Sequence, residues 1–337
     1  MQIPQITFTR FIAALGVVFF HFGKNIPPFD FFIVKNAYLG VSYFYVLSGF
    51  IMIIAYYQSS HINFNTYQKN RFSRIYPIYF VGVISQVLLT SNYSIKQILL
   101  CLFAIQSWVP GYALALNTPG WSISVEIFFY LLFPLLFNKY YKSTGIKKIA
   151  LVIFFIFIIT QIATAIRHLL PFHGIYFNSS DFSYFPLVHL NQFLIGNLSG
   201  LLFIRYLKDN LNYKKTYWIL LSIVGIALCL CLLIINYSRF SVHNGIMAIL
   251  FAPIIIFISF DKGCLSKFLS LKPLVYLGEI SYSLYILQLP VYVLTSRYIT
   301  IDNWMNLIIY IGILIIISII AFESIEKPAR NYFRKKL

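Results

Sequence analysis

Eleven apolar segments, separated by short polar stretches, constrain the fold of this chain more than any other feature of its sequence. Most are long enough to cross a bilayer, which requires about 20 residues of helix. Of the 337 residues 60% are hydrophobic and only 10% are charged, whereas a soluble domain has about 25% charged residues. The segments run roughly over 5–22, 38–57, 75–94, 97–116, 120–138, 149–166, 185–204, 216–236, 243–260, 274–296 and 304–322. The sequence therefore predicts an all-α, polytopic membrane helix bundle.

Lysines and arginines are concentrated in alternate connections between these segments. Cytoplasmic loops retain such an excess, so five basic clusters indicate the cytoplasmic side. They comprise Lys69, Arg71 and Arg74; Lys139, Lys142, Lys147 and Lys148; Arg205, Lys208, Lys214 and Lys215; Lys262, Lys267 and Lys272; and Lys327, Arg330, Arg334, Lys335 and Lys336. The retention of lysine and arginine in cytoplasmic loops also explains the net charge of +17. Without that explanation, such a charge would suggest a nucleic-acid partner. We therefore predict that the chain binds no nucleic acid.

One apolar segment must fail to cross, because three of them lie between the first two basic clusters and only an even number returns the chain to the same side. Trp108–Tyr112, which contains a proline and a glycine, divides 97–116 into two short halves. We expect this segment to be a re-entrant or outer-surface element. The prediction is then about ten transmembrane helices with both termini cytoplasmic, in a single membrane domain over 1–337 with a short basic tail at 327–337.

The first segment carries an arginine near one end and a histidine near the other. Arg10 and His21 are eleven positions apart, about 20° past three full turns, so they share one helical face and lie about 16 Å apart along it. Such groups are costly inside a bilayer unless they face a polar cavity. We expect the later helices to enclose that cavity, with Arg10 toward the cytoplasm and His21 toward the outer side.

Glu126 is the only charged residue of its apolar segment. It shares a helical face with Ser122 and Tyr130. A carboxylate inside the membrane indicates either function or a buried ion pair that fixes helix packing, and we predict function. Because Glu126 and His21 are both expected in the outer half of the membrane, their positions allow them to meet.

Other polar groups admit two interpretations each. Arg71 and Arg74, one helical turn apart, match either a phosphate clamp or a flank that contacts lipid headgroups. Ser281, Tyr285 and Gln288 form a polar stripe that suits a cavity wall or contacts between helices.

The remaining motifs point to packing. His189 and His243 suit substrate binding or, as the simpler interpretation, packing between helices with their ring nitrogens hydrogen-bonded. The stretch Leu47–Phe50 contains Gly49 and predicts a close helix contact. The spacing of the four cysteines suits neither a metal site nor a disulfide framework, so we predict no metal.

Taken together, these residues resemble the acyltransferase-3 family of bacterial membrane acyltransferases, which includes O-antigen and exopolysaccharide O-acetyltransferases. The resemblance covers essentially the whole chain and rests on the order and spacing of several motifs. They are Arg10 with His21; Ser48-Gly49-Phe50; Arg71-x-x-Arg74-Ile75-x-Pro77; Trp121-Ser122-x-x-x-Glu126-x-x-x-Tyr130; Leu277-Gly278-x-x-Ser281-Tyr282-x-x-Tyr285; and Glu326-Lys327-Pro328. Gln288 is a departure, since relatives commonly carry a histidine at that position.

The resemblance implies an O-acetyltransferase of the bacterial cytoplasmic (inner) membrane. Its co-substrate would be cytoplasmic acyl-coenzyme A, usually acetyl-coenzyme A, with no permanently bound cofactor, and its acceptor a sugar hydroxyl of a lipid-linked or growing glycan. Arg10, Arg71 and Arg74 would then hold the phosphates, His21 would act as general base and Glu126 would orient the imidazole. The residues expected to line the cavity or contact substrate are Ser48, Trp121, Ser122, Tyr130, Ser281, Tyr285 and Gln288.

Several alternatives remain at this stage. One is a transporter or flippase for a polyprenyl-linked glycan, with Arg10, His21 and Glu126 as a proton relay. Another is the same fold transferring succinyl, and a third is an acyl-histidine intermediate in place of direct transfer. A homo-oligomer is left open, as are the acceptor sugar and its hydroxyl.

Overall fold

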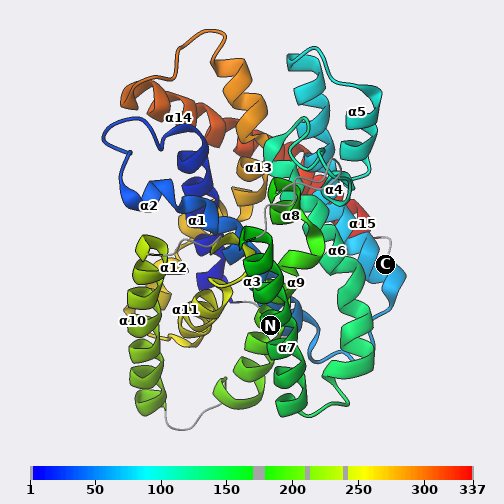
Figure 1. The fold of residues 1–337 in the computed structure, drawn as a ribbon, viewed down its shortest axis with the longest axis vertical. Coiled ribbons are helices and arrows are strands. Elements are labelled where there is room, and N and C mark those ends of the chain that lie inside the picture. The colour runs from blue at the N-terminus through cyan, green and yellow to red at the C-terminus, as the bar shows by residue number, and fades with distance from the viewer. Residues whose placement is uncertain (1–2, 170–178, 209–212, 238–241, 336–337) are drawn as a thin grey trace.

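The computed structural model describes residues 3–169, 179–208, 213–237 and 242–335, which form a bundle of helices (Figure 1). Within this part of the chain nine helices are long and apolar enough to cross a membrane, and no strand occurs. The long helices are α1 (Pro4–Phe22), α3 (Gly40–Tyr56), α4 (Phe64–Leu89), α6 (Trp121–Leu136), α7 (Ile146–Leu169), α9 (Pro186–Leu202), α10 (Tyr213–Tyr237), α13 (Lys272–Thr295) and α14 (Trp304–Ala321). The expected all-α polytopic bundle is confirmed.

Shorter helices connect the long ones. They are α2 (Phe32–Lys35), α5 (Ile95–Leu102), α8 (Ser179–Tyr184), α11 (Ala248–Phe260), α12 (Cys264–Leu269) and α15 (Lys327–Lys335). α11 is apolar but has only 13 residues, so the segment predicted over 243–260 is helical over less of its length than expected. Lys336 of the basic tail lies outside the described residues.

The segment 97–116 contains no long helix, as its proline and glycine predict. α5 begins with a capping box formed by Ser94 and Gln97 and has only eight residues. A short 3₁₀ turn over Gln106–Trp108 follows, and the next long helix starts at Trp121. This part of the chain is therefore an irregular connection between α4 and α6.

The boundary expected for the third segment is wrong. α4 begins at Phe64, about three turns earlier than the apolar pattern indicates, because the side chain of Asn63 accepts a 3.0 Å hydrogen bond from the backbone N–H of Thr66 and caps the helix. The polar residues that follow are therefore helical. Arg71 and Arg74 lie inside α4 rather than in a loop before it.

Glycines allow the central helices to approach closely. A Cβ atom on Gly49 of α3 would lie 2.1 Å from the carbonyl oxygen of Phe193 in α9, and one on Gly196 would lie 2.0 Å from the carbonyl oxygen of Val46. Backbone contacts of this kind are how membrane helices associate without a hydrophobic driving force. The packing role predicted for Gly49 is confirmed.

α7 and α10 expose apolar surface. Ile159 on α7 and Ile226 on α10 are each more than 60% exposed, and Trp218 is exposed beside them. Figure 1 shows that the α4–α5 and α13–α14 connections lie at one end of the bundle, whereas the α6–α7 connection and the start of α10 lie at the other. Apolar flanks between two polar ends characterise a multi-pass membrane protein.

Candidate active site

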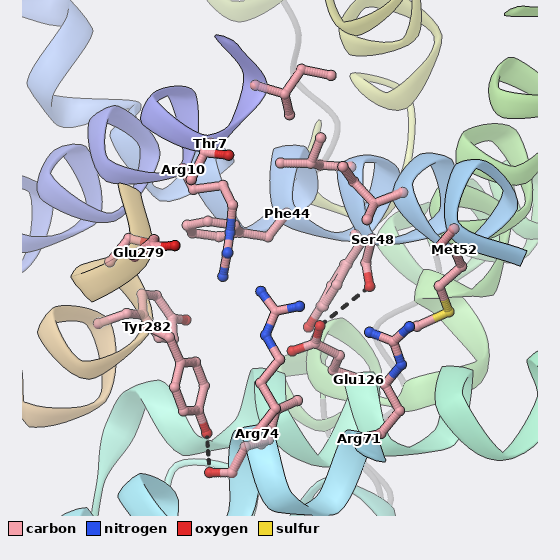
Figure 2. A pocket seen from close by; sticks show the side chains of 18 of the residues that line it. Thr7, Arg10, Phe44, Ser48, Met52, Arg71, Arg74, Glu126, Glu279 and Tyr282 are labelled. Carbon is pink, nitrogen blue, oxygen red and sulfur yellow. Dashed lines mark hydrogen bonds between the residues drawn. The ribbon is translucent and has the colours of Figure 1, made fainter. Parts of the chain in front are cut away.

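A cavity of about 370 Å³ lies inside the bundle, where α1, α3, α4, α6 and α13 meet. The residues just before α15 and α15 itself complete its wall. Figure 2 shows the polar side chains of these helices turned toward one another across this space. Nine of the twelve site residues expected from the sequence line the cavity: Arg10, Arg71, Arg74, Ser48, Ser122, Glu126, Tyr130, Ser281 and Tyr285.

Three arginines give the cavity its positive charge. The guanidinium groups of Arg10 and Arg74 point toward each other across it, and Glu126 lies between Arg74 and Arg71 (Figure 2). Within the part of the chain that the structure describes, no carboxylate forms an ion pair within 4 Å with Arg10, Arg71 or Arg74. Like charges placed together in a bundle interior favour an anion between them.

Aromatic rings hold the third arginine. The guanidinium carbon of Arg71 lies 5.2 Å from the ring centre of Tyr67 and 5.4 Å from that of Tyr130. The faces of these rings attract a cation. The Nε atom of Arg71 is buried without a hydrogen-bond partner, so Arg71 is fixed in position with donor capacity left for a ligand.

Glu126 has partners other than the histidine expected from the sequence. The Tyr130 hydroxyl donates a 2.5 Å hydrogen bond to its carboxylate, and Ser48 donates one of 3.3 Å. The predicted meeting of Glu126 with His21 is wrong. The helical face shared with Tyr130 keeps the carboxylate in the arginine cavity, which His21 does not line.

The partner of His21 is Gln288. Nδ1 of His21 lies 2.7 Å from Oε1 of Gln288, and the Gln288 amide nitrogen donates a 2.6 Å hydrogen bond to the carbonyl oxygen of Tyr285. A carbonyl oxygen only accepts, so the amide oxygen must face the imidazole and Nδ1 must carry the hydrogen. In the neutral ring Nε2 is then the basic nitrogen.

The single polar cavity expected to contain both Arg10 and His21 is divided in this structure. Ala14 and Val17, which lie between them on α1, are buried. A Cβ atom on Gly40 of α3 would lie 2.8 Å from the carbonyl oxygen of Ala13, so α1 and α3 touch here and leave no space.

Tyr285 forms the boundary between the cavity and His21. Its hydroxyl is 3.0 Å from the Ser122 hydroxyl, and its ring packs edge-on against Phe44 at 5.8 Å. These three side chains line the cavity, whereas the backbone of Tyr285 contacts Gln288. Tyr285 therefore contacts the cavity through its side chain and the partner of His21 through its backbone.

The two remaining predicted residues have other surroundings. Ser281 lines the cavity but donates its hydrogen to the carbonyl of Gly278 at 2.7 Å. Trp121 does not line it and packs on His189 and His243, each at 5.3 Å between ring centres. His189 is fully buried and hydrogen-bonded to the Ser183 carbonyl at 2.9 Å, as a packing residue would be.

Sequence reasoning missed three charged residues of the cavity, Glu279, Glu326 and Arg330. The sequence offered a signal, because the Glu326-Lys327-Pro328 motif follows the last apolar segment. On its own this motif indicates a family pattern and a basic tail and does not predict a place in the cavity. Among the described residues no group of three or more His, Cys, Asp or Glu side chains is arranged to hold a metal ion.

Comparison with known proteins identifies relatives of this chain. It is similar to the O-acetyltransferase OatA of Staphylococcus aureus, at 24% identity over 362 residues, covering 98% of this chain and 57% of that protein. It is 25% identical over 370 residues to the peptidoglycan O-acetyltransferase OatA of Listeria monocytogenes, with the same two coverages of 98% and 57%. The acyltransferase MdmB of Streptomyces mycarofaciens is 31% identical over 157 residues, which are 40% of this chain and 39% of that protein.

This chain spans just over half the length of the two OatA relatives. No solved structure matches it. A family model described as an acyltransferase domain matches residues 3–323. That match covers nearly every helix of the bundle and includes Arg10, Arg71 and Arg74 of the cavity, so the chain belongs to the acyltransferase-3 family of membrane proteins.

Proposed function

We propose that this protein is an O-acyltransferase of the bacterial cytoplasmic membrane that moves an acyl group, acetyl in the first instance, from cytoplasmic acyl-coenzyme A to a hydroxyl of a cell-surface glycan. The observation that carries the proposal is the cavity lined by Arg10, Arg71 and Arg74 without a carboxylate in contact with any of them. Its charge suits a ligand with several phosphates. Membership of the family supplies the class of reaction.

The donor would bind with its phosphates among these arginines. A guanidinium group presents several N–H donors in a fixed plane that matches phosphate oxygens. The pantetheine arm is thin and carries no charge, so it would extend past Ser122 toward Tyr285. Because Tyr285 and Phe44 close the cavity on that side, the proposal requires these side chains to move before the thioester meets His21.

His21 would act as the general base through Nε2. As the acceptor oxygen attacks the thioester carbonyl, its proton passes to Nε2, the new C–O bond forms and the C–S bond breaks. The proton then goes to the departing thiolate, which leaves as coenzyme A. The Gln288 oxygen at 2.7 Å accepts from Nδ1 in both states of the ring and stabilises the cation formed after proton uptake.

The acceptor is proposed as a glycan hydroxyl on the outer side. One OatA relative is named for peptidoglycan, and the motif resemblance includes O-antigen enzymes, so these are the two acceptors to test. The proton-relay transporter is less well supported, because Glu126 is bonded to Tyr130 and Ser48 and makes no hydrogen bond to His21.

The test is acetyl transfer by the purified protein in nanodiscs, using acetyl-coenzyme A labelled in the acetyl group and either peptidoglycan fragments or O-antigen as acceptor. We expect His21→Ala to lose the roughly 10²- to 10⁴-fold that a general base contributes. Its affinity for coenzyme A should be unchanged, because His21 does not line the arginine cavity. Arg71→Ala should instead lose coenzyme A binding.

The outcome that contradicts the proposal is glycan transport across a proteoliposome membrane with no labelled acyl group transferred. Transfer from succinyl-coenzyme A in preference to acetyl-coenzyme A would correct the acyl group and leave the class of reaction intact. Label recovered on the protein itself, lost in His21→Ala, would replace direct transfer by an acyl-histidine intermediate.

A further inference from the structure

The C-terminal helix is part of the cavity wall. Arg330 on α15 and Glu326 just before it both line the cavity. Figure 1 shows α15 beside α4, the helix that carries Arg71 and Arg74. A basic tail that topology alone would explain therefore contributes side chains to the site.

Among the described residues, Arg330 has no ion-pair partner within 4 Å. Its guanidinium carbon lies 5.9 Å from the ring centre of Phe322, and its Nε atom is buried without a hydrogen-bond partner. The nearest acid in the sequence, Glu326, is buried and accepts a 3.0 Å hydrogen bond from Ser283 instead. Glu326 lies near enough to attract the charge of Arg330, but in the described part of the chain Arg330 forms no ion pair within 4 Å and its buried Nε–H has no acceptor.

The adjacent cation on the same helix shows the contrast. Lys327 is 46% exposed and pairs with Glu323 at 2.7 Å, one helical turn away. It does not line the cavity. Lys327 is thus paired in solvent, whereas Arg330 has no ion-pair partner among the residues that the structure describes and faces the cavity. A positive charge that served only to orient the helices in the membrane would not need to face the cavity.

Arg330 comes from a different segment than the other arginines of the cavity. Arg10 belongs to α1, and Arg71 and Arg74 belong to α4, whereas Arg330 belongs to α15. A ligand with more than one phosphate group would contact arginines from these different helices. Coenzyme A is such a ligand, with a diphosphate next to the pantetheine arm and a monoester phosphate on the ribose at the end far from the thiol.

We propose that α15 completes the donor site and that Arg330 binds the ribose 3′-phosphate of the acyl-coenzyme A, while the arginines of α1 and α4 hold the diphosphate. This assignment rests on the proposed function, because it presumes a coenzyme A donor. It adds a phosphate subsite that tells coenzyme A from its dephosphorylated form. A lipid headgroup is the other source of phosphate at a membrane surface.

The experiment compares the binding of coenzyme A and 3′-dephospho-coenzyme A to the wild-type protein, to Arg330→Ala and to the matched control Lys327→Ala, all in nanodiscs of zwitterionic lipid. We expect the wild type and Lys327→Ala to prefer coenzyme A by about tenfold or more, the range of a charge-assisted hydrogen bond. Arg330→Ala should lose that preference and bind both nucleotides equally. Arg330→Gln, which keeps the length and polarity of the side chain, replaces it if the alanine variant does not fold.

Two results would overturn the subsite. The first is an Arg330 variant that still prefers coenzyme A as the wild type does. The second is a variant whose only defect is lost binding of anionic lipid, measured in nanodiscs that contain it. Failure of the wild type to bind either nucleotide would instead overturn the coenzyme A donor of the proposed function, and the subsite with it.

Discussion

Gln288 holds the imidazole of His21 in one tautomer through the 2.7 Å contact between Oε1 and Nδ1. Replacing it with leucine keeps the volume but removes the acceptor, so the ring can present either nitrogen. We expect Gln288→Leu to lower kcat by about 10- to 100-fold, part of what a general base contributes. The KM for acetyl-coenzyme A should stay within about twofold, because Gln288 lies outside the arginine cavity.

Gln288→Glu is the comparison variant, since it keeps an oxygen opposite Nδ1 and should retain more activity than Gln288→Leu. Initial rates of labelled acetyl transfer in nanodiscs measure both variants, and monodisperse elution shows that they fold. A wild-type rate in Gln288→Leu would mean that the tautomer of His21 does not matter for transfer.

Among the helices, stability depends on the close packing of α3 on α9. A Cβ atom on Gly49 would lie 2.1 Å from the Phe193 carbonyl oxygen, which belongs to the backbone and has no side-chain freedom. Gly49→Ala must therefore separate the two helices, at a cost of about 1–3 kcal/mol. We expect a lower thermal transition and weaker activity, because Ser48 is adjacent and bonded to Glu126.

Gly312→Ala on α14 is the matched control, because no atom lies within 4 Å of a Cβ added there. Helix propensity favours alanine by about 1 kcal/mol, so this variant should be as stable as the wild type or more so. Thermal unfolding in detergent followed by size exclusion checks both. Equal transitions for the two variants would show that α3 and α9 do not pack closely through Gly49.

For the whole molecule, charge distribution predicts orientation. The basic α6–α7 connection and the start of α10 lie at one end of the bundle and the α13–α14 connection at the other (Figure 1). The positive-inside rule predicts that the basic end faces the cytoplasm. In a cysteine-free background, we expect an impermeant maleimide to label Tyr298→Cys in intact cells and Ser143→Cys only after permeabilisation.

Both labelling positions are exposed, so the lack of reaction at either reports its side of the membrane rather than burial. Labelling of Ser143→Cys in intact cells would reverse the topology. It would also place the arginine cavity and its phosphate site away from the cytoplasmic pool of coenzyme A, which the proposed function cannot accommodate.

The sequence alone determined the class of fold and most of the cavity-lining residues. Periodicity and length identify membrane helices because the bilayer demands about 20 apolar residues in each. Rare charges inside those helices identify the cavity because hydrocarbon makes any other placement costly. Arg10 and Glu126 follow from that rule, whereas Arg71 and Arg74 follow from their spacing and the family resemblance; all four line the cavity.

Only the tertiary structure decided which of these groups meet. Helical periodicity places residues on a face of their own helix but says nothing about the rotation of the neighbouring helices. The partner of His21 therefore came from α13, as Gln288, and not from α6, as Glu126. Arg330 entered the site because α15 folds back on α4, a contact between segments some 260 residues apart along the chain that no local pattern records.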